Sequence, residues 1–395
     1  MKSPIWTLVT LLLLLTALHA ADPVVSNVTA AQRAGTKLVD ISFQVSDEDL
    51  DLVNMSVNVS DDSGLTFNVP STALSGDISI NAAPVATSHA LVWDAGIDFN
   101  QQFNSSMVVR VIADDGSGLG PAPPGMSLIP GGKFKMGDQQ VPPVGETDEL
   151  PVHEVYISTF YVDIFEVTLE LWREIRNWGL ANGYADMPLG QGEGARHPVH
   201  SIDWYAAVKW CNARSEKEGL LPVYYTDASH RTMDLDLQND FVLWTANGYR
   251  LPTEAEWEKA ARGGLVANQY PSGQGMTGSD SNYNGSGDPF ETGTTPVGFY
   301  DSQQWTSYII NRANGFGLYD MGGNISEMCW DWLDAGWYST ADAVIPDTRG
   351  PQGGNVRVAR GGAFFEGVEF TRCASRDFFH EFFEQLYGFR CARGL

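Results

Sequence analysis

Basic residues are scarce in this chain of 395 residues. Its 24 lysines and arginines face 49 aspartates and glutamates, which gives a formal net charge of −25. A nucleic-acid binder needs a surplus of cations to neutralise phosphates, so this balance excludes that class of function. Acidity of this size favours solubility, and it is compatible with cation binding without requiring it.

Cysteine and histidine are also sparse, with four and seven residues. No Cys-x-x-Cys pair is present, which argues against a structural zinc site. No His-x-x-x-His or two-His-plus-acid grouping was found, so a facial-triad iron site is set aside. An even number of cysteines in an exported protein permits two disulfides, and spacing alone leaves three pairings open. The four residues are Cys211, Cys329, Cys373 and Cys391.

Long apolar runs are absent except near the start of the chain. Residues 1–21 have a basic residue, Lys2, an apolar segment from Leu8 to Leu15 and a small-residue cleavage site at Ala20 or Ala21, which together predict a secretory signal peptide. The run is short for a membrane span, so we expect no span after cleavage; an uncleaved anchor is the alternative. The predicted location is secreted, periplasmic or on the cell surface.

Residues 22–115 contain short runs in which apolar and polar residues alternate, at 38–45, 55–59 and 107–112. A period of two is typical of half-buried strands, and turn-forming residues separate the runs. We expect an acidic all-β sandwich of immunoglobulin or fibronectin type that serves as a spacer or adhesion unit. Six acidic residues of this region could either bind calcium between strands or lie in solvated turns, and both interpretations stay open. They are Asp47, Glu48, Asp49, Asp51, Asp61 and Asp62.

A linker rich in glycine and proline is expected at residues 116–124, followed by a second domain over residues 125–395. This domain mixes short strands at 126–137 and 155–167 with helices. Thr168 is a good N-cap for one helix, and a buried stripe predicts another over 201–218 that Gly219 ends. Thr253 and Glu256 form a capping box at the start of a third helix. Residues 266–313 are expected to be mostly irregular surface.

The most informative stretch runs from Gly315 to Trp332 and reads Gly-Phe-Gly-Leu-Tyr-Asp-Met-Gly-Gly-Asn-Ile-Ser-Glu-Met-Cys-Trp-Asp-Trp. Its glycines allow positive φ angles and a tight loop. The oxygen donors of Asp320, Asn324 and Glu327, spaced across such a loop, suit a hard cation such as calcium. A tight turn whose acids face water is the alternative.

This stretch resembles the Gly-Leu-Tyr-Asp-Met-x-Gly-Asn-Val-Trp-Glu-Trp signature of the formylglycine-generating enzyme (sulfatase-modifying factor) family, with Ser326 and Met328 in place of two tryptophans. Further blocks of the family follow in order: 126–137, 247–264, 357–364, 372–376 and 388–391. The resemblance covers residues 125–395. It implies an irregular α/β fold, related to C-type lectins, behind the all-β module.

The resemblance also implies an activity, namely oxidation of a cysteine in a sulfatase Cys-x-Pro-x-Arg segment to formylglycine with oxygen and copper. In the family, two cysteines after the Gly-Gly of the last long block hold the copper. The matching segment here, Ala363 to Thr371, contains no cysteine. Thiolates are the soft ligands that Cu(I) prefers, so the expected copper pair is missing and no catalytic residue is assigned.

The family also implies roles for the cysteines and for two calcium sites. Cys211 and Cys391 match a disulfide of the eukaryotic enzymes, while Ala261 replaces the partner of Cys373 and leaves Cys373 to pair with Cys329. These last two could instead bind copper in a new place. The resemblance assigns structural calcium to two sites. The first site consists of the side chains of Asp320 and Glu327 and the backbone carbonyls of Gly323 and Ile325. The second site consists of Asn282 and the backbone carbonyl of Tyr283.

Near the C-terminus, aromatic residues recur with a helical period over 378–386. The pattern is compatible with core packing or with an aromatic, acidic ligand surface. We therefore expect an exported binding module without formylglycine-generating activity, with a protein or surface ligand; the alternative is the copper-dependent oxidase. The candidate ligand-binding residues are Phe364, Phe365, Glu366, Glu369, Phe378 and Phe379.

Overall fold

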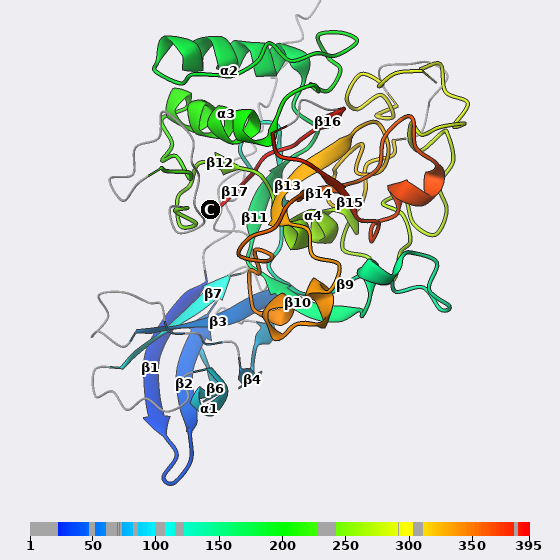
Figure 1. Ribbon diagram of the computed structural model, residues 1–395. Coiled ribbons are helices and arrows are strands. Elements are labelled where there is room, and N and C mark those ends of the chain that lie inside the picture. The colour runs from blue at the N-terminus through cyan, green and yellow to red at the C-terminus, as the bar shows by residue number, and fades with distance from the viewer. Residues whose placement is uncertain are drawn as a thin grey trace, which may run out of the picture. The chain divides into compact units, whose positions relative to one another are not determined.

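The structure is a computed structural model (Figure 1) that describes residues 23–46, 52–60, 69, 71, 73–81, 86–98, 107–114, 122–226, 242–290, 292–302, 311–382 and 386–395. The chain divides into two compact units, residues 1–120 and 121–395, and this boundary falls within the segment 116–124. The predicted signal peptide, the acids at 47–51 and 61–62 and most of the predicted linker lie outside the described residues.

The N-terminal unit consists of two antiparallel sheets, with strand orders β1-β2-β6-β4 and β5-β3-β7. The alternating runs at 38–45, 55–59 and 107–112 are confirmed as strands β2, β3 and β7. The elements are β1 (Val24–Gln32), β2 (Leu38–Ser46), β3 (Leu52–Ser60), β4 (Leu74–Gly76), β5 (Ser79–Asn81), β6 (Thr87–Asp94), α1 (Ala95–Asp98) and β7 (Val108–Asp114).

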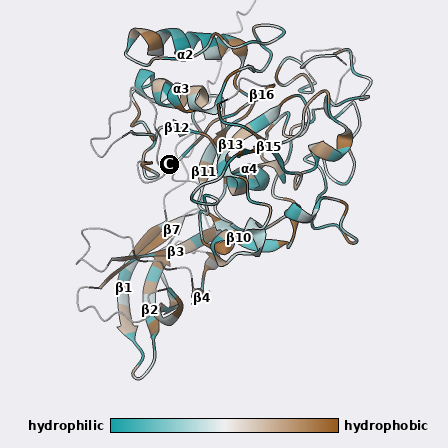
Figure 2. Cartoon of the chain, viewed as in Figure 1, coloured by the Kyte–Doolittle hydropathy of each residue, from teal (hydrophilic) through white to brown (hydrophobic). Residues whose placement is uncertain are grey.

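Both sheets of this unit contribute to a single apolar core. Ile41, Phe43 and Val45 of β2 point into it, and Val53 and Val57 of β3 face them from the other sheet. The polar residues between them face outward, as the period of two requires. Figure 2 shows the alternation of hydrophobic and hydrophilic positions along these strands.

The C-terminal unit contains three small sheets, with strand orders β10-β9, β12-β17-β11-β8 and β15-β14-β13-β16. Strands β13 and β16 are parallel, and the other described pairs in this unit are antiparallel. The strands are β8 (Met126–Ile129), β9 (Gly132–Met136), β10 (His153–Ile157), β11 (Phe160–Asp163), β12 (Tyr249–Arg250), β13 (Ser326–Trp332), β14 (Arg357–Arg360), β15 (Asp377–Phe379), β16 (Tyr387–Gly388) and β17 (Ala392–Arg393).

Three α-helices and several 3₁₀ turns complete the described part of this unit, and α2 and α3 lie side by side (Figure 1). The predicted caps are confirmed: Thr168 caps α2, and Thr253 forms a capping box with Glu256 at α4. Helix α3 ends before Gly219, which has a φ of 74°. The helices are α2 (Leu169–Ala181), α3 (Trp204–Lys217), α4 (Glu254–Ala261), η1 (Thr147–Glu149), η3 (Trp337–Ser339), η4 (Ala341–Val344) and η5 (Val368–Thr371). Among the described residues, none of the helices is long and apolar enough to cross a membrane.

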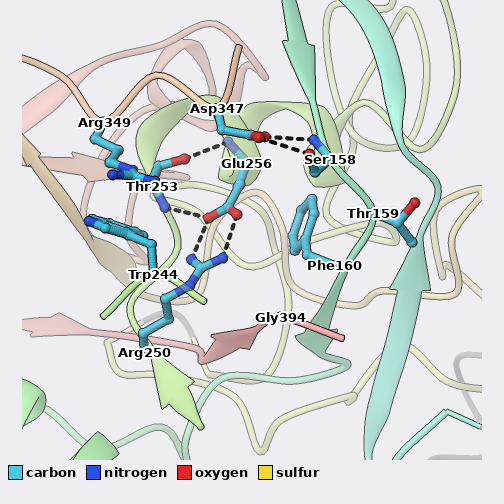
Figure 3. A pocket seen from close by; sticks show the side chains of 10 residues that line it. All are labelled: Ser158, Thr159, Phe160, Trp244, Arg250, Thr253, Glu256, Asp347, Arg349 and Gly394. Atoms are coloured by element: carbon cyan, nitrogen blue, oxygen red, sulfur yellow. Dashed lines mark hydrogen bonds and ion pairs between the residues drawn. The ribbon is translucent and has the colours of Figure 1, made fainter. Parts of the chain in front are cut away.

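Helix α4 is buried along its whole length although half of its residues are charged; Figure 2 shows it in hydrophilic colours. Ion pairs explain this. Glu256 accepts two hydrogen bonds of 2.6 Å from Arg250 (Figure 3). Glu258 contacts both Arg262 and Arg360. A buried charge is tolerated only when it is paired in this way, so the helix is held by electrostatics as much as by apolar packing.

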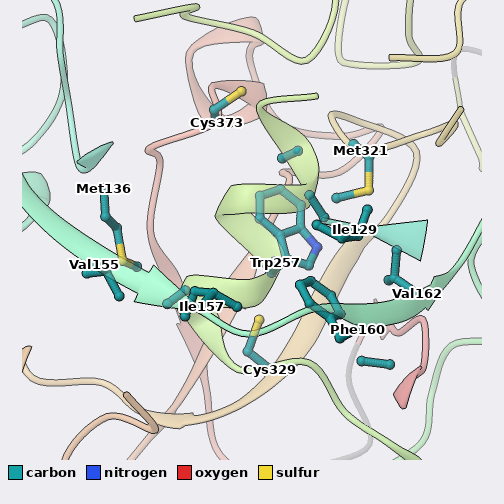
Figure 4. Close-up of a cluster of buried hydrophobic side chains, with 14 of the residues drawn as sticks. Ile129, Met136, Val155, Ile157, Phe160, Val162, Trp257, Met321, Cys329 and Cys373 are labelled. Carbon is teal, nitrogen blue, oxygen red and sulfur yellow. The ribbon is translucent and has the colours of Figure 1, made fainter. Parts of the chain in front are cut away.

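The apolar face of α4 packs into the main core of the unit through Trp257 (Figure 4). Ile129, Ile157 and Phe160 from β8, β10 and β11 belong to the same cluster. The indole N–H of Trp257 donates to Glu327 at 2.9 Å, which connects α4 to β13.

The expectation that residues 266–313 form mostly surface was wrong for much of the described part. This segment is irregular, but Asn282, Thr294, Thr295 and Phe299 are each completely buried. Side chains in loops of this kind replace the missing ladder bonds: Asn282 donates to the carbonyl of Gly293 at 2.9 Å. The irregular segment is therefore part of the core that supports the loop at 315–326.

Candidate functional site

The segment from Ala363 to Thr371, which the sequence resemblance matches to the family's copper-binding loop, follows β14. Gly361 and Gly362 have φ angles of 96° and 69°, and the chain turns sharply there. A Cβ atom on Gly362 would lie 2.8 Å from the carbonyl carbon of Phe370, so the turn requires glycine. This turn brings residues 363–371 back across the sheet that contains β13.

Glu366 is the central polar residue of this segment. Its carboxylate accepts hydrogen bonds from the backbone N–H of Ala363 at 2.9 Å and from the hydroxyl of Ser326 at 3.3 Å. Ser326 is one of the two residues that replace signature tryptophans. Because a serine stands there, Glu366 has a hydrogen-bond partner on β13.

A second carboxylate, Asp377 at the start of β15, lies in electrostatic contact with Glu366. The hydroxyl of Tyr387 donates to Asp377 at 3.2 Å. Burial raises the pKa of both carboxyl groups, and the proximity of Asp377 raises that of Glu366 further. Glu366 and Asp377 thus form a pair of half-buried acids that joins the segment 363–371 to strands β15 and β16.

Exposed apolar side chains flank this acid pair. Phe365 is 47% exposed beside Glu366, Phe378 is 53% exposed beside Asp377, and Leu386 is 41% exposed beside Tyr387. We call Phe365, Glu366, Asp377, Phe378 and Leu386 the C-terminal face. Phe364 packs edge-on against Phe365 with centroids 5.1 Å apart, Phe370 and Phe382 are also exposed, and Glu369 is exposed.

The helix predicted over 378–386 was wrong for residues 378–382, and residues 383–385 lie outside the described part. Residues 377–379 form strand β15, which pairs with β14, and the alternation of a strand then separates two neighbouring phenylalanines. Phe378 faces outward, whereas Phe379 is 2% exposed and packs on Tyr387. Phe379, a predicted ligand-binding residue, therefore belongs to the core.

The four cysteines are described as free, buried thiols. The sulfur atoms of Cys211 and Cys391 lie 3.7 Å apart, so the pair that the family resemblance implied is adjacent. Cys329 and Cys373 lie on opposite sides of Trp257 (Figure 4), and the structure does not bring them together. Burial raises the pKa of both these thiols, that of Cys373 to about 12. Buried thiols of this kind are poor thiolate donors.

The loop at 315–327 holds its acids in a buried network. Glu327 forms a close ion pair with Arg390, with oxygen–nitrogen distances of 2.6 to 2.9 Å. Asp320, with a φ of 57°, accepts from the N–H of Gly298 at 2.7 Å, and burial raises its pKa to about 6. Glu166 lies nearby, and its Oε2 atom is buried without a hydrogen-bond partner.

The second predicted cation position adjoins this loop. The backbone carbonyl of Asn282 accepts from the N–H of Asn324 at 2.7 Å, while its side-chain oxygen is buried without a partner. Tyr283, whose carbonyl was the other predicted ligand, accepts from the N–H of Ser286 at 2.9 Å. Within the described part of the chain, no three His, Cys, Asp or Glu side chains are arranged to hold a metal. A cation here would therefore depend on carbonyl and amide oxygens.

The sequence reasoning missed one cluster with two histidines and an acid. Glu193 lies 3.9 Å from ring nitrogens of both His197 and His200. Thr294 donates to Glu193 at 2.5 Å and accepts from Nδ1 of His197 at 2.9 Å. Burial lowers the pKa of both histidines, partly opposed by Glu193. The sequence spacing Glu-x₃-His-x₂-His could have indicated this cluster. Its fourth member, Thr294, comes from a distant loop.

Comparison with known proteins agrees with this architecture. The model of the sulfatase-modifying factor enzyme 1-like domain matches residues 119–395. The chain belongs to this family. It is similar to the formylglycine-generating enzyme of Thermomonospora curvata, with 31% identity over 264 residues, 61% of this chain and 82% of the relative.

Other proteins to which this chain is similar have different names. The serine/threonine-protein kinase pkn1 of Chlamydia caviae is 29% identical over 309 residues, 73% of this chain. The chain spans only 41% of that kinase. Among solved structures, Treponema denticola variable protein 1 aligns with a TM-score of 0.53 and 26% identity, over 68% of this chain and 94% of its own. The fold is thus shared among proteins with different names, and function has to be argued from the residues of the site.

Proposed function

We propose that the C-terminal unit is a binding module without formylglycine-generating activity, and that its C-terminal face captures a protein segment. The observation that carries this proposal is the replacement of the copper-binding thiols. The segment from Ala363 to Thr371 has no cysteine, and a Glu366–Ser326 hydrogen bond stands within it. A carboxylate is a hard donor, so this donor set does not fit a Cu(I) dithiolate, and we derive no oxidation step through copper.

The chemistry of the C-terminal face indicates the kind of partner. Contiguous exposed apolar groups on a folded protein mark interaction sites, and aromatic side chains contribute most to such contacts. The charges next to them are acidic: Glu366, Glu369 and Asp377. Because the whole chain carries a net charge of −25, complementarity favours a partner segment with apolar and basic side chains.

Affinity for a defined probe tests the binding role. An amphipathic peptide of leucine and lysine should bind the full-length protein, and Phe378→Ser should weaken the affinity by about tenfold, or 1.4 kcal/mol. Val141→Ser is the matched control, because Val141 is 97% exposed and belongs to the unrelated loop before η1. Equal affinities for both variants and the parent protein would contradict a role for the C-terminal face.

The second candidate is the copper- and oxygen-dependent oxidase acting on a sulfatase segment. The similarity to formylglycine-generating enzymes supports it. A turnover assay separates the two: the protein, supplied with copper and reductant in air, is incubated with a Cys-x-Pro-x-Arg peptide. We expect the peptide mass to stay unchanged. An aldehyde product would overturn the binding proposal and direct attention to Cys329 and Cys373 as ligands.

We also propose structural calcium at the loop that contains Asp320, with the carbonyls of Gly323 and Ile325 as further ligands. The unpartnered oxygens of Glu166 and Asn282 and the raised pKa of Asp320 support this, because a cation would neutralise the buried charge. Glu327, the other predicted side-chain ligand, already forms an ion pair with Arg390, so it would have to bind calcium and Arg390 at the same time.

Calcium should raise the unfolding temperature relative to EDTA, by the equivalent of about 2.7 kcal/mol at a concentration 100-fold above Kd. Asp320→Asn, which removes the charge but keeps an oxygen donor, should reduce this shift. Asp342→Asn, which removes an exposed acid elsewhere, is the control. Identical unfolding curves in calcium and EDTA would argue against the site.

For the N-terminal unit we propose a sandwich of immunoglobulin or fibronectin type that spaces the binding module from the exported protein's surroundings. The two sheets with one shared core support this proposal. The signal peptide predicted at residues 1–21 is the reason for proposing export.

A further inference from the structure

A small pocket in the C-terminal unit is lined by residues outside the segment Ala363–Thr371 (Figure 3). It encloses about 120 Å³, and its walls come from β11, the start of α4 and the loop at 344–350. A cavity of about 150 Å³ is known to hold benzene, so this pocket has room for roughly five to seven non-hydrogen atoms. The lining residues that matter here are Ser158, Trp244, Arg250, Glu256, Asp347 and Arg349.

Two of the charges that line the pocket neutralise each other. Arg250 and Glu256 form a bidentate ion pair at 2.6 Å, so neither is available to a ligand without losing the other. This pair forms a fixed polar wall beside Trp244.

The other two charges form no ion pair within the described ranges, although each acts electrostatically on the other. Asp347 accepts hydrogen bonds from the N–H and the hydroxyl of Ser158, at 2.7 and 2.8 Å, but forms no ion pair with any described residue. Arg349 has its guanidinium 4.1 Å from the ring centroid of Trp244, and it too has no ion pair within the described ranges. One carboxylate and one guanidinium thus line the same pocket, close enough to interact electrostatically but without an ion pair between them.

The backbone at Asp347 supports a role beyond packing. Its φ of 52° lies in the left-handed region, which a non-glycine residue seldom occupies. The bonds to Ser158 hold it there, and they fix the direction of the carboxylate. Such strain is commonly found where a side chain has to be presented to a ligand.

We propose that this pocket binds a small free α-amino acid of the size of glycine, alanine or serine. The carboxylate of the ligand would pair with the forked guanidinium of Arg349, and its ammonium group would pair with Asp347. A zwitterion matches the two opposite charges at once and adds no net charge to the site. The enclosed volume limits the side chain to one or two non-hydrogen atoms. This site is independent of the proposed C-terminal face.

Calorimetric titration of the full-length protein with glycine, alanine and serine tests the proposal. Concentrations up to on the order of 10 mM fill even a millimolar site. Acetate and methylamine, which each carry one of the two charges, should bind at least about tenfold more weakly than glycine. Leucine should not compete, because its side chain exceeds the space.

Two variants locate the site. Asp347→Asn keeps a residue that tolerates the left-handed backbone, and Arg349→Gln keeps a polar chain of similar length. Each should weaken glycine binding by about tenfold or more, while the exposed controls Asp342→Asn and Arg173→Gln leave it unchanged. The proposal is overturned if none of the three amino acids binds, if acetate binds as well as glycine, or if the two variants, shown to be folded by circular dichroism, bind like the parent protein.

Discussion

At the scale of single residues, paired charges distinguish the core of the C-terminal unit. Glu258 of α4 is completely buried and contacts three partners: the N–H of Gly137 at 2.9 Å, Arg262 at 2.6 Å, and Arg360. Burial alone would raise its pKa, but the two guanidinium groups outweigh this effect and lower the pKa of Glu258. The carboxylate therefore compensates the charge of Arg262 and much of that of Arg360, which also lies 3.7 Å from Glu254.

Glu258→Gln should accordingly destabilise the protein by about 3–5 kcal/mol, because it leaves buried guanidinium charge uncompensated. Urea unfolding monitored by tryptophan fluorescence measures this loss. Glu154→Gln removes one partner of the exposed pair with Lys133 and should cost less than about 1 kcal/mol. A loss of similar size for the two variants would show that the buried network contributes no more than a surface pair.

The same residue predicts a pH dependence. A carboxyl group whose pKa is lowered by folding stabilises the native state above its ordinary pKa of 4.5, and this contribution disappears as the pH falls through the lowered value. The stability difference between the parent protein and Glu258→Gln should therefore be constant near neutral pH and shrink below about pH 4.5. A difference that grows on acidification would contradict this assignment.

At the scale of elements, local signals predicted the helices well and the C-terminal segment poorly. Thr168, Thr253 and Gly219 mark helix ends through bonds within a few residues, so the sequence alone contains what is needed. The apolar period at 378–386 was misleading, since pairing of β15 with the distant β14 determines the conformation of Phe378 and Phe379. Long-range partners of this kind are not visible in local periodicity.

In the candidate site, too, local features could be predicted from the sequence and long-range contacts could not. The absence of thiols between 363 and 371 was readable from the sequence, and so was the oxygen-rich loop around Asp320. The contacts of Glu366 with Ser326 and Asp377, and of Glu193 with two histidines, join segments that only the fold brings together. The arginine partner of Glu327 lies 63 residues away in sequence, and it was not foreseen for that reason.

The capping box of α4 gives a prediction at this scale. Thr253→Ala removes the hydroxyl that accepts from the N–H of Glu256 and should destabilise the protein by about 1–2 kcal/mol in thermal or urea unfolding. Thr245→Ala, at an exposed threonine outside any helix cap, should change stability by less than about 0.5 kcal/mol. Equal stabilities would indicate that tertiary packing alone fixes the start of α4.

At the scale of the whole molecule, Cys211 of α3 and Cys391 beside β17 connect segments 180 residues apart. We predict that these thiols form a disulfide in an oxidising environment, and that reducing it costs about 2–5 kcal/mol of stability. Mass spectrometry of an unreduced proteolytic digest should detect the cross-linked peptides, and Cys329→Ala should leave them unchanged. A link between Cys329 and Cys373 in place of this pair would contradict the arrangement around Trp257.

The separation of Cys329 and Cys373 by Trp257 has a practical consequence. Two thiols that are sealed in the core and distant from each other react with an alkylating reagent only when that core opens. Their rate of modification in ordinary buffer would report the population of the opened core, or the opening rate itself when alkylation is faster than reclosing. Alkylation of Cys329 and Cys373 is therefore a measure of transient opening of the central core.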